Sequence, residues 1–341
     1  MKKTKSIWIA LAILVMLSTA VLGCSSGNTN TNQAGDTSTP EKTESTNGAA
    51  ASNTDKAAEQ AADQGVRSYT DYKNHTVNIP VAPQRVVFAG ETTGDLVELG
   101  INPVGIFGDT VSRTLYADKL ASVEDVGFPI SLEKVLSLNP DLILVADTDE
   151  AAYEKLAQIA PTIMFNTFGT LDDRITELGD IFGKEQEASQ WLANYNTQVA
   201  EMWKQLHAAG VNPGETASVF TYYPGNRLFV MAISGLPQLL YGEDGFKPTA
   251  GIQEILDANE GFRQISPEAI QELAGDHIFI LDPVAEEAKK STESLMSSSV
   301  WETLPAVKKG HVYRLEIEKS NADAYTRREM LQELPKLLNN K

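Results

Sequence analysis

Two segments of the chain, 135 positions apart, repeat one helix-then-strand pattern, and this repeat limits the possible fold more than any other feature. Residues 131–147 read SLEKVLSLNPDLILVAD and residues 266–282 read SPEAIQELAGDHIFILD, with six of seventeen positions identical. Each copy starts with Ser, a favoured helix N-cap, and has Glu in the first turn. A near-continuous apolar strand follows, as is typical of a parallel sheet covered by helices. The repeat therefore predicts two similar α/β lobes.

Other apolar segments add strands to both lobes. The first lobe is expected to use 85–90, 103–108 and 162–167, and the second to use 217–223, 227–232 and 311–316. The part of the chain expected to fold, from about Arg67 onward, has about 275 residues and exceeds the usual size of a single hydrophobic core. Length therefore also favours two lobes.

A single long helix is predicted between the lobes. Residues 183–210 read GKEQEASQWLANYNTQVAEMWKQLHAAG, with no helix breaker between the two terminal glycines. Apolar side chains recur at helical spacing, at Ala188, Trp191, Leu192, Tyr195, Val199, Met202, Trp203 and Leu206. About 26 residues at a rise of 1.5 Å per residue would span roughly 39 Å, the diameter of a lobe. The connection is therefore expected to be one uninterrupted helix.

The start of the chain has the pattern of an export signal. A basic stretch, Met1 to Lys5, precedes an apolar run from Ile7 to Leu22. That run is shorter than the ~20 residues a spanning helix needs, so it is interpreted as a secretory signal. Val21 to Cys24, which read VLGC, resemble the lipobox of bacterial lipoproteins, in which the cysteine is acylated and becomes the new N-terminus. Cys24 is the only cysteine of the chain, so no intramolecular disulfide can form.

Residues 24–66 are expected to form a disordered tether behind the lipid anchor. From Ser25 onward this stretch is filled with Ser, Thr, Asn, Ala and Gly, and Val66 is its one branched aliphatic residue. Such a composition buries too little apolar surface to offset the entropy of ordering. The net charge is −18, and about −21 once the signal of residues 1–23, with three lysines and no acid, is removed. A charge of this sign argues against nucleic acid and anionic lipid as main partners.

These features together resemble a known family, the substrate-binding proteins of iron–siderophore and cobalamin ABC importers. The resemblance covers roughly residues 67–338. It is carried by VNIPVAPQRVV (77–87), DLVELGINPVGI (95–106), VGFPISLEKVLSLNPDLILV (126–145), IFGKEQEA (181–188) and LPAVKKGHVY (304–313). It implies an α/β fold of two Rossmann-like lobes joined by one long α-helix, as in class III periplasmic binding proteins. The lobes would be residues 67–183 and 210–341, with residues 184–209 as the bridging helix.

The resemblance also implies a function in transport. The protein would be a monomer on the extracytoplasmic face of the cell membrane, lipid-anchored, in a Gram-positive bacterium. It would capture a ferric siderophore and deliver it to an ABC permease, without a cofactor or catalysis. In such proteins one glutamate on each lobe forms salt bridges with arginines of the permease. Glu133 and Glu268, at matched positions of the repeat, are the residues that would do so here.

The ligand is expected to contact loops at the carboxyl ends of the strands, as in other open α/β sheets. The expected ligand-binding residues are Thr92, Arg113, Tyr116 and Phe168 in the first lobe, and Tyr222, Tyr223, Arg227 and Tyr325 in the second. A siderophore fills the coordination positions of its iron, so the protein needs cations, donors and aromatic faces rather than metal ligands. The modest number of cations favours a hydroxamate siderophore, because triscatecholates carry more negative charge.

Three alternatives stay open at this point. Haem or cobalamin could be the ligand within the same family, with Met231 or Tyr222 as an axial ligand of haem. An exported enzyme is a second alternative, although the chain has no G-x-S-x-G, G-x-x-x-x-G-K or H-E-x-x-H motif and no cysteine beyond Cys24. A wall-binding module is the third. A metal site of the protein's own is not expected, because the four histidines are scattered along the chain.

Overall fold

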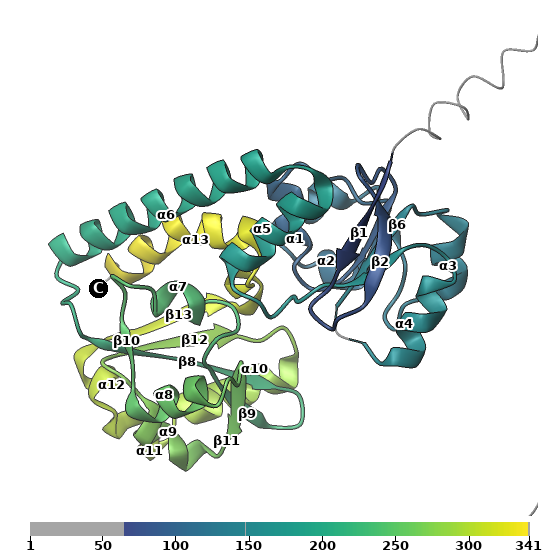
Figure 1. Ribbon diagram of the computed structural model, residues 1–341. Coiled ribbons are helices and arrows are strands. Elements are labelled where there is room, and N and C mark those ends of the chain that lie inside the picture. The colour runs from purple at the N-terminus through teal and green to yellow at the C-terminus, as the bar shows by residue number, and fades with distance from the viewer. Residues whose placement is uncertain (1–64, 147, 340–341) are drawn as a thin grey trace, which may run out of the picture. The chain divides into compact units, whose positions relative to one another are not determined.

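The computed structural model describes residues 65–146 and 148–339 (Figure 1). The predicted signal of residues 1–23, the predicted lipidation site Cys24 and nearly all of the predicted tether lie outside the described residues. The first strand begins at Val66, the last residue that was assigned to the tether. All described residues belong to one compact unit. Among the described helices, none combines the length and the apolar character that crossing a membrane requires.

The first half of the described chain contains a sheet of five parallel strands in the order β5-β4-β3-β6-β7. The strands are β3 (Val86–Ala89), β4 (Gly105–Ile106), β5 (Glu124–Asp125), β6 (Leu142–Val145) and β7 (Thr162–Met164). The helices of this half are α1 (Thr93–Glu98), α2 (Gly108–Val111), η1 (Ala117–Leu120), α3 (Leu132–Ser137), α4 (Glu150–Ala157) and α5 (Leu171–Phe182). Strands therefore alternate with helices, as the repeat predicts.

Helices cover both faces of this sheet because its strands are apolar on both sides. Val86 and Phe88 of β3 pack in one cluster with Ile175 of α5. The alternate residue Val87 packs in a separate cluster with Val135 of α3. Successive strand side chains point to opposite faces, so an all-apolar strand such as β3 needs a helical layer on each side.

A hairpin of β1 (Val66–Thr70) and β2 (Thr76–Pro80) precedes this sheet and was not predicted. Asp71, at the turn, is buried and accepts a hydrogen bond from the backbone N–H of Met164 in β7 at 2.9 Å. The carboxyl group of Asp71 also lies 2.9 Å from the ring of His75. The contact with Met164 attaches the hairpin to β7, at an edge of the sheet, and the contact with His75 holds the turn together.

Helix α6 spans Glu185–Ala208, inside the predicted segment 184–209 (Figure 1). Its buried side chains include Tyr195, Met202 and Trp203, which belong to the apolar pattern that predicted the helix. The limits of the two lobes on either side of α6 stay predictions.

The second half contains a six-stranded mixed sheet with the order β11-β9-β8-β12-β13, and β10 pairs with β8. The strands are β8 (Thr216–Tyr223), β9 (Arg227–Met231), β10 (Lys247–Pro248), β11 (Phe262–Ile265), β12 (His277–Asp282) and β13 (Val312–Glu316). The remaining helices are α7 (Pro237–Leu240), α8 (Ala250–Asp257), η2 (Pro267–Ala269), α9 (Ile270–Leu273), α10 (Glu286–Met296), α11 (Ser299–Thr303), α12 (Pro305–Lys309), η3 (Ile317–Ser320) and α13 (Ala324–Asn339).

The prediction of a parallel sheet is wrong for part of this second half. Strands β8, β12 and β13 are parallel, but β9 is antiparallel to β8. Only Pro224, Gly225 and Asn226 connect β8 to β9, and a crossover between parallel strands needs a dozen or more residues. Gly225 and Asn226 both have positive φ angles, 83° and 52°, as this tight turn requires.

The two copies of the sequence repeat differ in their helices. Ser131 caps α3 and accepts a hydrogen bond from the backbone N–H of Lys134. Ser266 stands at the start of the 3-10 helix η2 and makes no such side-chain cap, and α9 follows for one turn only. The predicted two-turn helix of the second copy is therefore divided into a 3-10 turn and a short α-helix.

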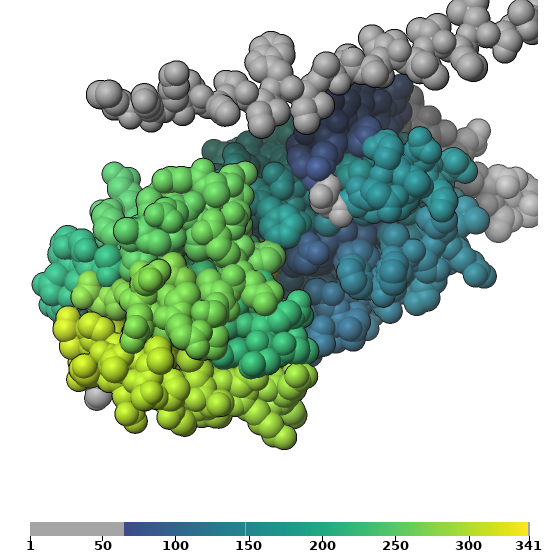
Figure 2. All heavy atoms as spheres, turned by 90° about the horizontal axis from the view of Figure 1, so that it is seen from below, coloured from purple at the N-terminus to yellow at the C-terminus, as the bar shows by residue number. Residues whose placement is uncertain are grey.

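One continuous hydrophobic cluster joins the two sheets through the long helices. It contains Phe88 of the first sheet, Trp203 of α6, Leu334 of α13 and Val219 of the second sheet. Figure 1 shows α13, in yellow, beside α6, in teal, and these two helices are in contact. In Figure 2 the surface of the first half, blue to teal, and that of the second half, green to yellow, form separate regions. The two halves thus share a buried core along α6 and α13.

The start of α13 is attached to the first half by a buried ion pair. Arg174 of α5 and Asp95 of α1 are both fully buried, with Arg174 Nε donating to Asp95 Oδ2 at 2.8 Å. Asp95 Oδ1 accepts the backbone N–H of Ala324 at 2.6 Å, and Arg174 Nη2 donates to the carbonyl oxygen of Ala322 at 2.6 Å. The charges of one half of the protein therefore hold backbone groups of the other.

A second buried carboxyl group, that of Asp323, lies at the same place. It is fully buried and accepts hydrogen bonds from the backbone N–H and the hydroxyl of Thr326, each at 2.9 Å. Burial, with a smaller effect of the nearby Asp95 charge, raises the pKa of Asp323 to about 7. The folded protein therefore binds this proton more tightly than the unfolded chain does, and the contribution of Asp323 to stability falls as the pH rises from about 4 to about 7.

The replacement Asp323→Asn is expected to raise the free energy of unfolding at pH 8 by about 1–2 kcal/mol, because the amide removes a buried negative charge and keeps the shape of the group. The gain should shrink at pH 5, where the carboxyl group of the wild-type protein already holds its proton. Urea unfolding of both proteins at pH 5 and pH 8 measures this. An equal difference at the two pH values would contradict the assignment of the pH dependence to Asp323.

Candidate functional site

A cavity of about 360 Å³ lies at the carboxyl edge of the first sheet. Its walls are the ends of β3 and β6, the residue after β4, the segment before α3 and the start of α4. The lining residues are Ala89, Glu91, Phe107, Phe128, Pro129, Ile130, Leu132, Val145, Ala146, Thr148, Asp149, Ala151, Ala152 and Lys155. This edge is where ligands bind in open α/β sheets, since the loops that follow neighbouring strands meet there.

The walls of this cavity combine aromatic and charged side chains. Phe107 and Phe128 meet edge to face with ring centres 5.3 Å apart, and Phe128 is 76% exposed. Asp149 caps α4 and accepts the backbone N–H of Ala152 at 2.8 Å. Glu91 accepts a hydrogen bond from the hydroxyl of Thr167 at 3.1 Å. The cavity can therefore hold an organic ligand with apolar and charged parts.

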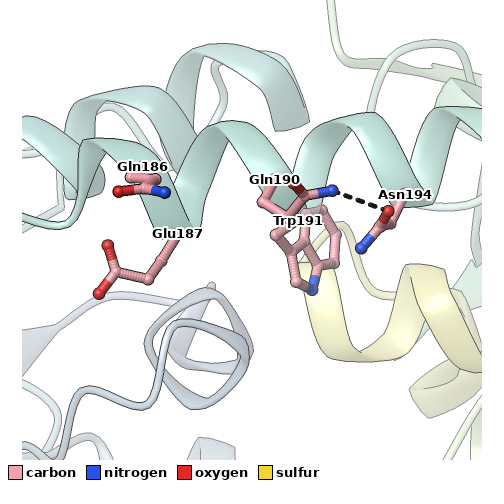
Figure 3. Close-up of a pocket in the computed structure, with 5 residues that line it drawn as sticks. All are labelled: Gln186, Glu187, Gln190, Trp191 and Asn194. Carbon is pink, nitrogen blue, oxygen red and sulfur yellow. Dashed lines mark hydrogen bonds between the residues drawn. The ribbon is translucent and has the colours of Figure 1, made fainter.

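A larger hollow of about 560 Å³ lies along α6 (Figure 3), with residues of that helix alone as its lining. Its amide side chains are engaged with each other, as Gln190 donates to Asn194 at 3.0 Å. The indole of Trp191 lies beside this pair (Figure 3). Its Nε1 donates to Glu98 at 2.8 Å. A surface on one helix brings no loops together, so the smaller cavity at the strand ends is the better candidate site.

The predicted ligand residues of the first half lie in different environments. Phe168, after β7, is 62% exposed, and Arg113 is about half exposed and lies 3.7 Å from Asp109. Thr92 and Tyr116 are buried, at 3% and 1% exposure. Phe168 and Arg113 are thus available to a ligand as they stand, whereas Thr92 and Tyr116 are reachable only if the surrounding side chains move.

Tyr116 and Tyr325 are brought together by the structure, but inside the packing around α13. Their ring centres lie 5.5 Å apart, and the guanidinium of Arg328 lies 4.8 Å from the ring centre of Tyr325. Burial raises the pKa of Tyr116 well above its ordinary value. Their positions show a packing role for both rings, and contact of either ring with ligand stays a prediction.

Three of the four predicted residues of the second half, Tyr222, Tyr223 and Arg227, lie at the β8–β9 hairpin. This hairpin is at the carboxyl edge of β8. Tyr223 pairs with Arg227 in the ladder, and Tyr223 is 38% exposed. Arg227 is exposed and donates from Nε to the carbonyl oxygen of Pro224 at 2.9 Å. Among the described residues Arg227 forms no ion pair, so its charge is available to an anionic oxygen.

Axial ligation of haem finds no support in the positions of Tyr222 and Met231. Tyr222 is 4% exposed and Met231 is 8% exposed, and both belong to strands. Burial, with the nearby charge of Glu268, also raises the pKa of Tyr222, so its phenolate is disfavoured. Within the described part of the chain, no three His, Cys, Asp or Glu side chains form a group that could hold a metal ion.

Glu133 and Glu268 are both exposed, the first on α3 and the second on η2. Neither forms an ion pair within the described residues. A hydrogen bond from its own backbone N–H, with help from Ser266, lowers the pKa of Glu268. These two carboxylates are therefore accessible, and permease docking stays a prediction.

The residues that line the cavity were largely missed by sequence reasoning. Glu91 directly precedes the predicted residue Thr92, in the same segment after β3. Phe128 stands in a segment that was used only for the family resemblance, and Lys155 lies on a helix face. The available signal was position, since each follows a strand of the first sheet within about a dozen residues.

Comparison with known proteins identifies the family. The family described as periplasmic binding protein matches residues 86–318. The iron(3+)-hydroxamate-binding protein YxeB of Bacillus subtilis is 32% identical over 266 residues, which cover 77% of this chain and 80% of the relative. Such named relatives are binding proteins, not enzymes.

Two solved structures have the same fold. Staphylococcus aureus SirA, complexed with staphyloferrin B, superposes with a TM-score of 0.72 at 29% identity, over 80% of this chain and 98% of SirA. S. aureus FhuD2 with bound ferrioxamine B has a TM-score of 0.67 at 27% identity, over 75% of this chain and 98% of FhuD2. These likenesses confirm the predicted fold class of two Rossmann-like lobes and one long helix. With a family match over more than half of its length, the chain belongs to the periplasmic binding protein family and is a binding protein rather than an enzyme.

Proposed function

We propose that this protein captures a ferric siderophore of hydroxamate type outside the cell and delivers it to an ABC permease. Acylated Cys24 would hold it on the extracytoplasmic face of the membrane. The observation that carries the proposal is the pair of strand edges with free aromatic and cationic side chains. Phe128 and Phe168 stand at the first edge, and Tyr223 and Arg227 at the second. The names of YxeB and of the ferrioxamine-bound FhuD2 support a hydroxamate ligand.

These side chains match the chemistry of a ferric hydroxamate. Its iron is already coordinated by six oxygens, which carry partial negative charge and accept hydrogen bonds. The guanidinium of Arg227, which forms no ion pair in the part of the chain that the structure describes, can donate to these oxygens. The linkers between the hydroxamates are mainly CH₂ groups, which pack against aromatic faces such as Phe168.

Delivery is the second part of the proposal. The protein is expected to present Glu133 and Glu268 to arginines of a permease, one on each half of the protein. Their exposure and the lack of an ion pair for either carboxylate among the described residues support this role. The two glutamates also occupy equivalent positions in the two copies of the repeat. Two unrelated surface acids would have no reason to do so.

Ferrioxamine B is expected to bind the wild-type protein saturably, with quenching of tryptophan fluorescence. Arg227→Ala should weaken this binding about tenfold, because a charge-assisted hydrogen bond to a chelate oxygen is lost. The control is Arg263→Ala, which removes an arginine that is already paired with Glu260 at 2.8 Å.

Three outcomes would contradict parts of the proposal. Equal loss in Arg227→Ala and in the control would show that Arg227 has no specific role. If the folded wild-type protein binds no ferric hydroxamate, while haem or cobalamin binds, the ligand class is wrong. If ferric citrate or a catecholate binds instead, the iron function stands and the hydroxamate assignment fails.

A further inference from the structure

The cavity at the carboxyl edge of the first sheet, defined above, has more acidic than basic groups. Its lining contains the carboxylates of Glu91 and Asp149 and the ammonium group of Lys155. Glu91 and Lys155 are exposed, so both signs of charge are accessible from the solvent. The described lining thus has a net charge of one unit negative. A ferric chelate with only anionic groups would not gain from this surface.

Each of the two carboxylates has one oxygen engaged and one oxygen free. Glu91 Oε2 accepts from the hydroxyl of Thr167 at 3.1 Å, and Asp149 Oδ1 accepts from the backbone N–H of Ala152 at 2.8 Å. The other oxygen of each carboxylate has no hydrogen-bond partner among the described residues. The engaged oxygen orients the group, so that the free oxygen is an acceptor whose position is already set.

The remaining walls of the cavity suit a chain of CH₂ groups that ends in a cation. Phe107, Phe128, Pro129 and Val145 form apolar surface beside the acids. The exposed ring of Phe128 offers a face on which an ammonium group is attracted by the negative π-system. A primary ammonium on an alkyl arm satisfies all three features at once: apolar walls, an aromatic face and free carboxylate oxygens.

We propose that this cavity binds an ammonium-bearing arm of the ligand, and that Glu91 and Asp149 make the protein prefer cationic ferric hydroxamates to neutral ones. This inference rests on the proposed function, because the hydroxamate chelate itself would contact predicted ligand-binding residues such as Phe168 and Arg227. It adds a site for a second part of the ligand and a reason for selectivity within one chemical class. Lys155 limits the preference, because its charge opposes that of the arm.

The test compares two ligands that differ in one charge. Ferrioxamine B has three hydroxamates and a terminal primary ammonium group, and N-acetylation converts that ammonium group into a neutral amide without changing the iron site. The full-length protein, purified in detergent, is titrated with each ferric complex at low ionic strength. The wild-type protein is expected to bind the ammonium form about fivefold more tightly, as for one charge-assisted contact at a partly exposed site.

The matched variants locate the preference. In the double variant Glu91→Gln/Asp149→Asn the ratio of the two affinities, ammonium form over acetylated form, should fall to about one. Asparagine remains a good N-cap, so α4 keeps its start. The control Glu154→Gln removes an exposed acid of the same helix that does not line the cavity, and it should keep the wild-type ratio.

The outcomes separate this inference from the proposed function. Equal binding of both forms by the wild-type protein overturns the inference and leaves the hydroxamate function standing. A wild-type preference that survives in the double variant overturns the assignment to this cavity. Two results together support the inference. The preference is lost in the double variant but kept in the Glu154→Gln control, and the preference of the wild-type protein for the ammonium form decreases at high salt. If neither form binds to the folded protein, the proposed function fails and the inference fails with it.

Discussion

Replacement of Arg174 by methionine is expected to lower the free energy of unfolding by about 3–5 kcal/mol. Arg174 and Asp95 are both fully buried, and methionine would leave the Asp95 charge in the core without its partner. The carbonyl oxygens of Ala322 and Gly169 would also lose a donor each. Urea unfolding at pH 8, followed by circular dichroism, measures the loss.

Two further variants show whether the buried charge is the cause. The double variant Arg174→Met/Asp95→Asn should recover part of the lost stability, because it removes the uncompensated charge. The control Arg263→Met removes an arginine from an exposed ion pair with Glu260 and should have little effect. If Arg174→Met costs no more than this control, the buried pair does not stabilise the junction between α13 and the first half.

The double replacement Glu133→Gln/Glu268→Gln is expected to lower siderophore uptake about tenfold or more. Each glutamine would leave an arginine of the permease without its partner, and removing one member of an interfacial charge pair is costly. Affinity for the siderophore should not change, because both residues lie on helices outside the cavity. Uptake of radioactive iron by cells that depend on this protein, together with a titration of the purified variant, measures both quantities.

The control for this experiment keeps the same loss of charge. Glu124→Gln/Glu187→Gln removes two exposed acids that do not lie in the repeat, one on β5 and one on α6. It should leave uptake near the wild-type level. Normal uptake with the docking variant, or the same decrease with the control, would show that these two glutamates do not dock a permease.

The parts of the fold that could be predicted from sequence are those set by local periodicity. Helix α6 follows from apolar side chains at helical spacing over seven turns, and β6 and β12 follow from short continuous apolar runs. The pattern of α6 is repeated over many residues, so one polar side chain on its apolar face would not change the prediction of a helix. The antiparallel pairing of β9 was missed, although the three-residue connection 224–226 was visible in the sequence.

The candidate site was predicted only in part, because exposure depends on neighbours that are distant in the chain. Phe168 follows β7, and Tyr223 and Arg227 stand at the ends of β8 and β9 on either side of their turn. All three are accessible. Tyr116 comes from a similar loop but is buried against Tyr325, which lies more than 200 positions away in the chain. Phe128 and Glu91 line the cavity because parallel strands bring their loops to one edge.

The sequence by itself determined the α/β class, the long connecting helix and the family, because each depends on patterns that a chain expresses over neighbouring residues. Only the tertiary structure decided which acids would be buried and which would remain free. Asp95 and Asp323 are enclosed where α13 meets α1, whereas Glu91 and Asp149 each keep at a cavity one oxygen that no described residue binds. All four side chains are carboxylates, so the sequence does not distinguish them. The solvent exposure of each one is set by residues that are far away in the chain.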